Sequence, residues 1–252
     1  NFGNDLPKQF WQLGDKPVIA HSLDYFHRHP TIAAIILVLA ESYIPHMADI
    51  LPKTQKPVHL VAGGATRQDS VHAGLTALAG LKNYQNINYV AIHDAARPLI
   101  PADLLNCLIA AIDNNKYGKP KNEIIGAVPV LPLADSIKTI DKGNSDNNPT
   151  NCRGLITGGI DRSQLAAAQT PQLFRRDILT KLHNDFAGKG GFTDDCSLVE
   201  AAGFKITMVD GAKQLMKLTD ADDFAMLSHL VAADSTAQQY QQQTDDNSMT
   251  ET

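Results

Sequence analysis

The stretch YVAIHDAARPLI, residues 89–100, begins as an apolar run and ends in charged side chains. Residues 89–92 are of the kinds that are enriched in buried strands, and His93, Asp94 and Arg97 follow closely. Because ligands bind beyond the carboxyl ends of the strands in an open parallel sheet, the aspartate and the arginine are candidates for a functional site. A local ion pair between Asp94 and Arg97 explains the same residues, and the stretch alone does not decide between these interpretations. His93 we expect to be structural.

The rest of the chain continues the alternation of short apolar runs and longer amphipathic segments. The apolar runs predict strands over residues 32–39, 58–61, 89–92, 123–130 and 204–209. The amphipathic segments predict helices over residues 18–29, 67–78, 101–115 and 175–187. Strands that alternate with helices indicate an α/β fold, and we expect a Rossmann-like three-layer sandwich with a mostly parallel sheet.

Two segments depart from this alternation. Residues 131–164 have no helical periodicity, and their two short β-like runs flank a polar, Asn-rich centre. This pattern predicts a protruding β-arm. Residues 234–252 are polar and rich in glutamine, which indicates a disordered tail. We therefore expect one domain over residues 1–233.

The composition excludes several classes of protein. The 252 residues carry a net charge of −5 without a basic block, which argues against nucleic-acid binding. The longest strongly apolar run, residues 32–40, is about half as long as a bilayer span requires, and no signal-peptide pattern is present. The three cysteines form no CxxC motif, so neither a zinc ribbon nor a disulfide framework is indicated. We expect a cytoplasmic protein that binds no membrane.

A glycine-rich stretch after the predicted strand 58–61 is a second candidate site. Gly63 and Gly64 let the backbone approach a ligand, and Arg67 and Ser70 open the helix that follows. Backbone N–H groups at the start of a helix favour anions. A glycine turn followed by a helix cap also explains the stretch, and from these residues alone the structural interpretation is the stronger one.

Two acidic clusters nearer the C-terminus are further candidates. Thr193, Asp194 and Asp195 suit the N-cap and first turn of a helix, which accounts for most of that cluster without a substrate. Lys217 lies among apolar residues in a predicted short strand, with Thr219 as the cap of the next helix. A lysine in that setting faces either solvent or a phosphate group, because burying it unpaired is costly.

In chain order, these stretches resemble the 2-C-methyl-D-erythritol 4-phosphate cytidylyltransferase family of the non-mevalonate isoprenoid pathway. The resemblance runs from about residue 3 to residue 231. The stretches that carry it are LPKQFWQLGDKPVIAHSLDYF, GGATRQDSVHAGL, VAIHDAARPLI, ADSIKT, DRSQLAAAQTPQLF, FTDDCSLVE and MKLTDADDF. The motifs PKQ, HDAARP and TPQLF in this order are far more specific than one glycine motif.

The resemblance implies a nucleotidyltransferase that joins CTP and 2-C-methyl-D-erythritol 4-phosphate. A phosphate oxygen of the sugar alcohol attacks the α-phosphorus of CTP, pyrophosphate leaves, and the product is CDP-methylerythritol. Such a step depends on positioning and on positive charge where negative charge develops. The resemblance also implies Mg²⁺ as the cofactor that bridges the phosphates.

Roles for individual residues follow from the same resemblance. The residues implied to be catalytic are Lys8, which contacts the triphosphate, and Arg162 and Lys217, which hold the substrate phosphate. The implied substrate-binding residues are Gly63, Gly64, Ser70, Asp94, Arg97, Ser136 and Thr193. Asp94 is also the implied metal ligand. Ser136 stands where the family usually has threonine, so the hydroxyl group is kept.

In this family the arm is exchanged between the subunits of a homodimer, so the resemblance implies that Ser136 and Arg162 complete the neighbour's active site. The family also carries a strand and a glycine-rich loop that wraps the triphosphate, just before the PKQ motif. Only the six residues NFGNDL precede that motif here. We expect that an N-terminal segment lies outside this sequence, and that a chain truly without it loses an inner strand and most of its affinity for CTP.

Two alternatives remain open. A pentitol-phosphate cytidylyltransferase shares the fold and the CTP chemistry, although the HDAARP motif favours the first family. A catalytically weak nucleotide-binding relative is the alternative from another class, and the presence of both Lys8 and Lys217 argues against it.

Overall fold

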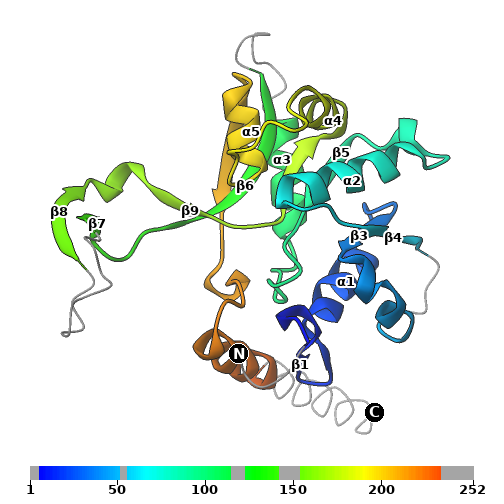
Figure 1. The fold of residues 1–252 in the computed structure, drawn as a ribbon, viewed down its shortest axis with the longest axis horizontal. Coiled ribbons are helices and arrows are strands. Elements are labelled where there is room, and N and C mark those ends of the chain that lie inside the picture. Colours follow the sequence, from blue (N-terminus) through cyan, green and yellow to red (C-terminus); the bar gives the residue numbers. More distant parts are fainter. Residues whose placement is uncertain (1–5, 52–55, 115–122, 142–153, 234–252) are drawn as a thin grey trace, which may run out of the picture.

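The computed structural model describes residues 6–51, 56–114, 123–141 and 154–233 of the chain. Helices pack around a central five-stranded sheet, and an arm projects to one side (Figure 1). The strands of this sheet are β5 (Tyr89–Ile92), β6 (Ile124–Pro132), β9 (Ala166–Ala168), β10 (Gln172–Arg175) and β11 (Lys205–Asp210). The α/β class predicted from the alternating pattern is confirmed.

The central sheet is mixed, so the prediction of a mostly parallel sheet was wrong. Its order is β11-β6-β10-β5, with β9 beside β6. β11 pairs with β6 in parallel, whereas β10 runs antiparallel to both β5 and β6, and β9 runs antiparallel to β6. The cause is the route of the chain, which leaves β6 for the arm and returns through β9 into β10. A direct return of this kind reverses the strand direction, whereas parallel neighbours need a long crossover.

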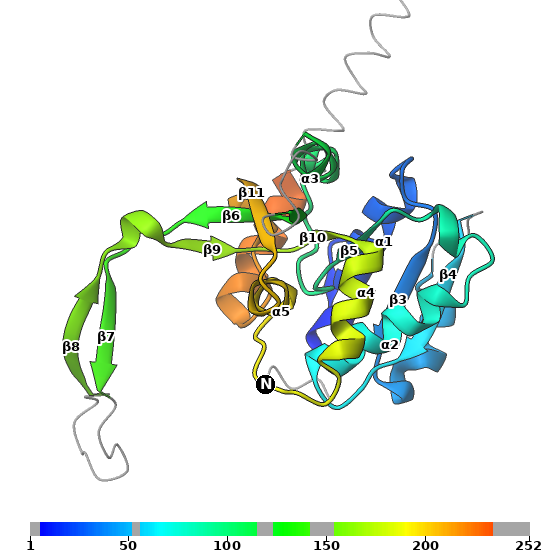
Figure 2. The same cartoon turned by 90° about the horizontal axis from the view of Figure 1, so that it is seen from above.

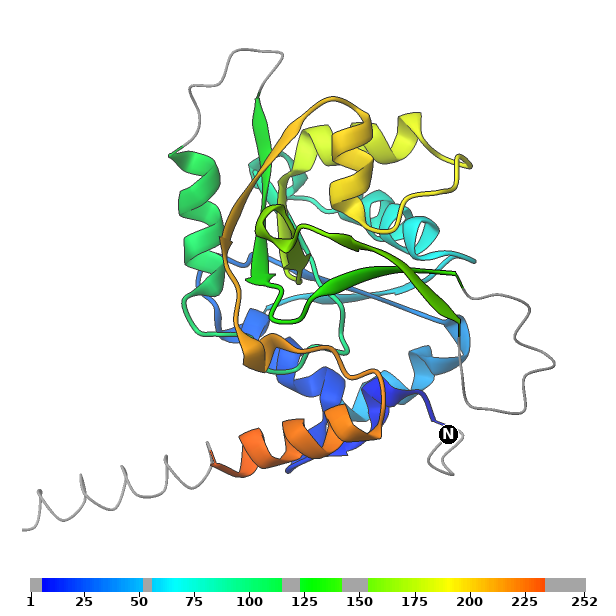
Figure 3. The ribbon, with the colours of Figure 1, turned by 90° about the vertical axis from the view of Figure 1, so that its left-hand side faces the viewer.

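Helices cover both faces of the sheet (Figure 3). α3 (Leu104–Asp113) packs on one face, and α2 (Arg67–Ala79), α4 (Arg176–Asp185) and α5 (Asp195–Ala201) pack on the other. Adjacent residues of β10 enter the two different hydrophobic clusters, Leu173 on the side of α3 and Phe174 on the side of α4 and α5. This alternation is what a strand buried on both faces requires.

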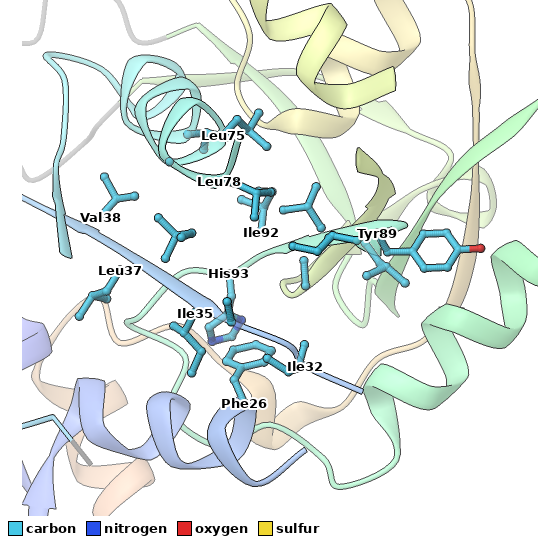
Figure 4. Close-up of a pocket in the computed structure, with 18 of the residues that line it drawn as sticks. Phe26, Ile32, Ile35, Leu37, Val38, Leu75, Leu78, Tyr89, Ile92 and His93 are labelled. Carbon is cyan, nitrogen blue, oxygen red and sulfur yellow. The ribbon is translucent and has the colours of Figure 1, made fainter. Parts of the chain in front are cut away.

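A separate parallel pair lies beside the central sheet, made of β3 (Ile35–Leu39) and β4 (Val58–Ala62). No strand ladder joins β3 to β5 in the parts of the chain that the structure describes. Between them lies a cavity of about 630 Å³, whose lining includes Ile35, Leu37, Leu75, Leu78 and Ile92 (Figure 4). Most of the side chains labelled there are apolar, and most come from these two strands and from the helix α2.

The arm is a hairpin of β7 (Ile137–Asp141) and β8 (Leu155–Ile160), which pair antiparallel. It stands well away from the sheet (Figure 2). The arm predicted over residues 131–164 is therefore present, and its Asn-rich centre, residues 142–153, lies outside the described residues. Several large apolar side chains of the arm are exposed, namely Ile140, Leu155, Ile156 and Ile160.

The N-terminal part of the described chain packs against its C-terminal part. β1 (Gln12–Leu13), β2 (Lys16–Pro17) and α1 (Val18–Arg28) precede β3, and a helix covers residues 221–233. Leu13 and Val18 share one hydrophobic cluster with Leu218 and Leu227. The predicted disordered tail, residues 234–252, lies outside the described residues. Within those residues, no helix combines the length and the apolar character needed to cross a membrane.

Candidate functional site

A cleft of about 240 Å³ opens at the carboxyl ends of β3 and β5. Its lining includes Leu39 at the end of β3, Asp94 just past β5, Phe10 from the N-terminal part and Lys217 from the C-terminal part. Segments far apart in the sequence therefore meet where α/β sheets bind their ligands. Asp94 and Lys217 were both predicted as site residues, and the fold brings them together in this cleft.

The turn that carries Asp94 is fixed by backbone hydrogen bonds. The Arg97 N–H donates to the Asp94 carbonyl oxygen at 2.9 Å, which closes the turn. The Asp94 N–H donates to Thr170 Oγ1 at 3.0 Å, and Thr170 is buried in the segment that leads into β10. Thr170 belongs to the TPQLF motif, to which the sequence analysis gave no individual role. Its hydroxyl group holds the backbone of the site.

His93 is structural, as expected. Its Nε2 donates to the Arg97 carbonyl oxygen at 3.1 Å, because a carbonyl only accepts, and its Nδ1 lies 3.2 Å from Thr170 Oγ1. The ring also packs edge-on against Phe26, with 5.3 Å between the ring centroids. Burial lowers the pKa of His93 to about 4, so the imidazole is neutral at physiological pH.

The Asp94 carboxylate is shared between two cations. Lys217 Nζ donates to Asp94 Oδ2 at 2.8 Å, and Arg67 Nε lies 3.8 Å from Asp94 Oδ1. Burial raises the pKa of Asp94, but the hydrogen bond and charge of Lys217, then the charges of Arg67 and Arg97, outweigh it. The pKa of Asp94 therefore lies below its ordinary value, and the carboxylate is ionised at neutral pH.

Arg97 does not form the local ion pair that the sequence left open. Its Nη1 donates to the Leu215 carbonyl oxygen at 2.8 Å, and the ion-pair partners of Asp94 are Lys217 and Arg67. The Arg97 Nε is buried and has no hydrogen-bond partner among the described residues. A buried donor without a partner is rare. Arg97 is not among the described residues that line the cleft.

Lys217 lies in an extended segment without a strand ladder, so the prediction of a short strand there was wrong. The segment follows the turn Lys213–Leu215 and is held by the Leu218 N–H, which donates to the Ala96 carbonyl oxygen at 2.8 Å. Lys8 Nζ donates to the Thr219 carbonyl oxygen, so Lys8 contacts the segment that carries Lys217. The predicted cap of the next helix also differs, because Asp220 rather than Thr219 accepts from the N–H of Asp223, at 3.0 Å.

Behind the cleft, Arg67 connects Asp94 to a buried carboxylate. Arg67 Nη1 lies 2.8 Å from Asp195 Oδ2, and His183 Nε2 donates to Asp195 Oδ1 at 2.9 Å. Asp195 and His183 are 2% and 1% exposed. In the sequence, Asp195 suits the first turn of a helix, and Arg67 suits the start of another. The ion pair between them connects elements that are distant in the sequence, so no local pattern indicated it.

The glycine-rich stretch has a clear structural role. Thr66 and Asp69 form a capping box at the start of α2, and the Gly64 N–H donates to Ser70 Oγ at 3.2 Å. A Cβ atom at Gly64 would clash with the Cβ of Asp69, and one at Gly63 would lie 2.9 Å from Ser70 Oγ. The glycines let the loop pack closely on the helix start. Their role toward a nucleotide stays a prediction.

The arm residues do not contact the cleft of their own chain. Arg162 Nη1 donates to the Ala134 carbonyl oxygen at the base of the arm, near Ser136, which is exposed. Neither residue contacts Asp94 or Lys217 within the described chain. Thr193 lies just before α5, whose N-cap is Asp194, and it is therefore two positions from the buried Asp195.

The side chains that line the cleft offer few oxygen ligands, so they suit a cation that is held mainly by the phosphates of a bound substrate. In the described parts of the chain, no group of three or more His, Cys, Asp or Glu side chains is arranged so that it could hold a metal ion by itself. Asp94 is the one carboxylate among the described residues that line the cleft. Mg²⁺ is commonly bound by one or two carboxylates together with substrate phosphates, so a single carboxylate fits Mg²⁺ in complex with a nucleotide.

A family model and similar protein sequences point to the same family. A family model described as 2-C-methyl-D-erythritol 4-phosphate cytidylyltransferase matches residues 1–251. A relative of that name from Cereibacter sphaeroides is 34% identical over 230 residues, which cover 91% of this chain and 91% of the relative. The "Bifunctional enzyme IspD/IspF" of Rhizorhabdus wittichii is 36% identical over 223 residues, which cover 88% of this chain and 50% of the relative. The chain thus spans about half the length of such bifunctional relatives.

Solved structures show the same fold. The crystal structure of 2-C-methyl-D-erythritol 4-phosphate cytidylyltransferase from Thermus thermophilus superposes with a TM-score of 0.66 at 26% sequence identity. The match covers 90% of this chain and 94% of that chain. The arrangement of helices and strands described above is therefore shared with that protein.

Proposed function

Because the chain belongs to the 2-C-methyl-D-erythritol 4-phosphate cytidylyltransferase family, we propose that it transfers the cytidylyl group of CTP to 2-C-methyl-D-erythritol 4-phosphate. The products are CDP-methylerythritol and pyrophosphate, in non-mevalonate isoprenoid biosynthesis. The observation that carries the proposal is the cleft in which Asp94 and Lys217 meet at the carboxyl end of β5. An ammonium group in the cleft can bind a phosphate group, and a carboxylate beside it can bind the metal ion that accompanies a nucleotide.

The reaction forms one bond and breaks another at the α-phosphorus of CTP. A phosphate oxygen of the sugar alcohol attacks this phosphorus, and the bond to the bridging oxygen of the β-phosphate breaks. Negative charge develops on the leaving pyrophosphate, so the protein contributes positioning and positive charge rather than covalent chemistry. Lys8 is proposed to supply charge at the triphosphate.

Lys217 is proposed to hold the substrate phosphate for attack. Its side chain is 46% exposed, and its ammonium group is neutralised by Asp94 in the absence of substrate. An arriving phosphate offers more negative charge than the carboxylate, so the ammonium group is able to turn toward it. Arg97, which lies in the same turn as Asp94, is proposed to contribute to the substrate site, as the resemblance to the family implies.

Mg²⁺ is proposed as the cofactor, bound by Asp94 together with phosphate oxygens of CTP. The ion supplies charge neutralisation at the phosphates when it is bound. The lowered pKa of the Asp94 carboxyl supports this assignment, because a metal ligand has to be deprotonated. The glycine stretch with Gly63, Gly64 and Ser70 is proposed to contact the cytidine part of CTP, and Thr193 the sugar alcohol.

The arm is proposed to be exchanged between the subunits of a homodimer. Leu155 and Ile156 on β8 are 73% and 70% exposed, which is unusual for large apolar side chains that are adjacent in the chain. Ser136 and Arg162 at the base of the arm make no contact with their own cleft in the described chain. Their proposed place is the active site of the partner subunit, where Arg162 would hold the substrate phosphate.

A cytoplasmic location is proposed as well, and the thiols of Cys107 and Cys196, which form no disulfide, support it. The test of the function is release of pyrophosphate by the full-length protein with CTP, Mg²⁺ and 2-C-methyl-D-erythritol 4-phosphate. A pentitol phosphate in place of the natural substrate separates the two related activities. Release with the pentitol phosphate and none with methylerythritol phosphate would overturn the proposal.

A further inference from the structure

Arg67 lies between two carboxylates that come from different parts of the fold. It is the first residue of α2, directly after the N-cap Thr66. Its Nη1 contacts Asp195 at the start of α5 at 2.8 Å, and its Nε faces Asp94 beyond β5 at 3.8 Å. The guanidinium therefore connects the start of one helix, the start of another and the end of a strand.

Asp195 is a fixed anchor for this guanidinium. Its side chain is 2% exposed, and its Oδ1 accepts from the imidazole of His183 on α4. Its Oδ2 forms an ion pair with Arg67 Nη1 at 2.8 Å, without the alignment of a hydrogen bond. Because Asp195 is almost completely buried, the loss of Arg67 would leave an unpaired buried charge, which is costly, and this cost holds Arg67 beside Asp195. Arg67 has only limited freedom to move away from Asp195.

The two ion-pair partners of Asp94, Lys217 and Arg67, differ in how freely their side chains can move. Lys217 has a flexible side chain that is 46% exposed, and it contacts Asp94 Oδ2 alone among the carboxylates of the described chain. Arg67 is 36% exposed and is held from behind by Asp195. When Lys217 turns to a phosphate group, Arg67 is the ion-pair partner that remains beside Asp94 among the described residues.

We propose that Arg67 is a positioning residue of the reaction, anchored by Asp195, which keeps the Asp94 carboxylate in place while Lys217 binds the substrate phosphate. This inference rests on the proposed function. It assigns to Asp195 a second role besides packing, because the buried carboxylate acts on the cleft through Arg67. The order of contacts is Asp195 to Arg67, Arg67 to Asp94, and Asp94 to Lys217.

The test is a double-mutant cycle on the full-length protein, with the rate of pyrophosphate release as the readout. The variants are Arg67→Met, Asp195→Asn and the double variant, and Arg67→Lys is the conservative replacement. Asn at residue 195 still accepts from His183 and keeps the volume of the side chain. Arg176→Met is the matched control, because Arg176 is a half-buried arginine that packs over the Tyr84 ring at 4.1 Å, outside the cleft.

We expect Arg67→Met to lower kcat/KM for methylerythritol phosphate about 10- to 100-fold, the usual cost of removing a group that orients a ligand-binding side chain. Arg67→Lys restores part of the loss, and Arg176→Met leaves the kinetics unchanged. Asp195→Asn lowers kcat/KM less than Arg67→Met does. In the Arg67→Met background it causes no further loss, because its effect passes through Arg67.

The outcomes separate the inference from the function on which it rests. Unchanged kcat and KM in Arg67→Met, measured below its unfolding temperature, would overturn the positioning role. Fully multiplicative effects of the two single variants would overturn the anchoring by Asp195. A wild-type protein that releases no pyrophosphate with either sugar-alcohol phosphate would instead overturn the proposed function.

Discussion

Lys217 Nζ donates to Asp94 Oδ2 at 2.8 Å across a separation of 123 positions in the chain. The turn after β5 carries the carboxylate, and the segment before the last described helix carries the ammonium group. Two hydrogen bonds, from the Asp94 N–H to Thr170 and from the Leu218 N–H to Ala96, fix the segments on which the two charges lie. The pair thus depends on the whole fold, and it lines the cleft in which we propose that the reaction occurs.

Lys217→Ala should lower turnover with little effect on folding. The side chain is 46% exposed, so its loss removes charge from the cleft and little packing from the core. We expect kcat to fall about 100-fold, as for the loss of a group that positions a reacting phosphate for attack. The free energy of unfolding should change by less than about 1 kcal/mol. Pyrophosphate release and urea denaturation measure the two effects.

Lys205→Ala is the control for this variant. Lys205 is exposed at the start of β11, at the opposite end of the strand from the cleft. Its kinetics should match those of the wild-type protein. A large loss of thermal stability in Lys217→Ala with normal kinetics would contradict the role that we propose for Lys217.

Asp94→Asn should raise the Mg²⁺ concentration at which activity is half-maximal. The amide keeps the volume of the side chain and an oxygen that accepts from Lys217, but it loses the charge that the ion requires. We expect an increase of about tenfold or more. Asp177→Asn, on the exposed first turn of α4, is the control. An unchanged Mg²⁺ dependence in Asp94→Asn would show that Asp94 is no metal ligand.

Local patterns predicted most of the elements, and the mistakes have physical causes. The runs over 89–92 and 204–209 were predicted as strands, and they form β5 and β11. Their apolar residues gave a clear local signal. The four residues of β10 were missed, because so short a run directly before a helix carries little periodicity of its own. The direction of β10 depends on the return from the arm, which no local pattern encodes.

The candidate site could be predicted only in part. Asp94 and Lys217 each follow or flank an apolar run, and that position made them visible in the sequence. The ion pair of Arg67 and the buried Asp195 could not be found in this way, because the two residues are far apart in the chain and also suit ordinary helix starts. Thr170 was likewise hidden, since its role is a hydrogen bond to the backbone of a distant turn.

His93 should make the protein less stable in mild acid. Its pKa is lowered from 6.5 to about 4 by burial, so the unfolded chain binds the proton more tightly than the folded protein does. The stability that comes from keeping His93 neutral is fully present above pH 6.5. It decreases as the pH falls toward 4 and changes no further below that value. The difference between the two pKa values corresponds to about 3 kcal/mol.

The measurement is urea denaturation of the wild type and of His93→Gln over this pH range. Glutamine keeps a donor for the Arg97 carbonyl oxygen but has no group that titrates. The stability of the variant should fall less steeply between pH 6.5 and 4 than that of the wild type. Parallel curves for the two proteins would show that His93 is not the group responsible.

Charges on the arm should dissociate the proposed homodimer. Leu155→Asp combined with Ile156→Asp puts two carboxylates on the exposed apolar surface of β8, and we expect a monomer in light scattering. Met226→Asp is the control, because Met226 is 57% exposed on the helix over 221–233 rather than on the arm. The arm variant should also lose activity, since Arg162 would no longer reach a partner's cleft. A wild-type protein that is monomeric at micromolar concentration contradicts the exchange of arms.

Product formation by the full-length protein tests the central claim most directly. Phosphorus NMR follows a mixture of the protein, CTP, Mg²⁺ and 2-C-methyl-D-erythritol 4-phosphate. The proposed function predicts equal amounts of pyrophosphate and of a CDP-linked methylerythritol, and little of either with Lys217→Ala. Unconsumed substrates and no signal from either product, with a correctly folded full-length protein, would contradict the account.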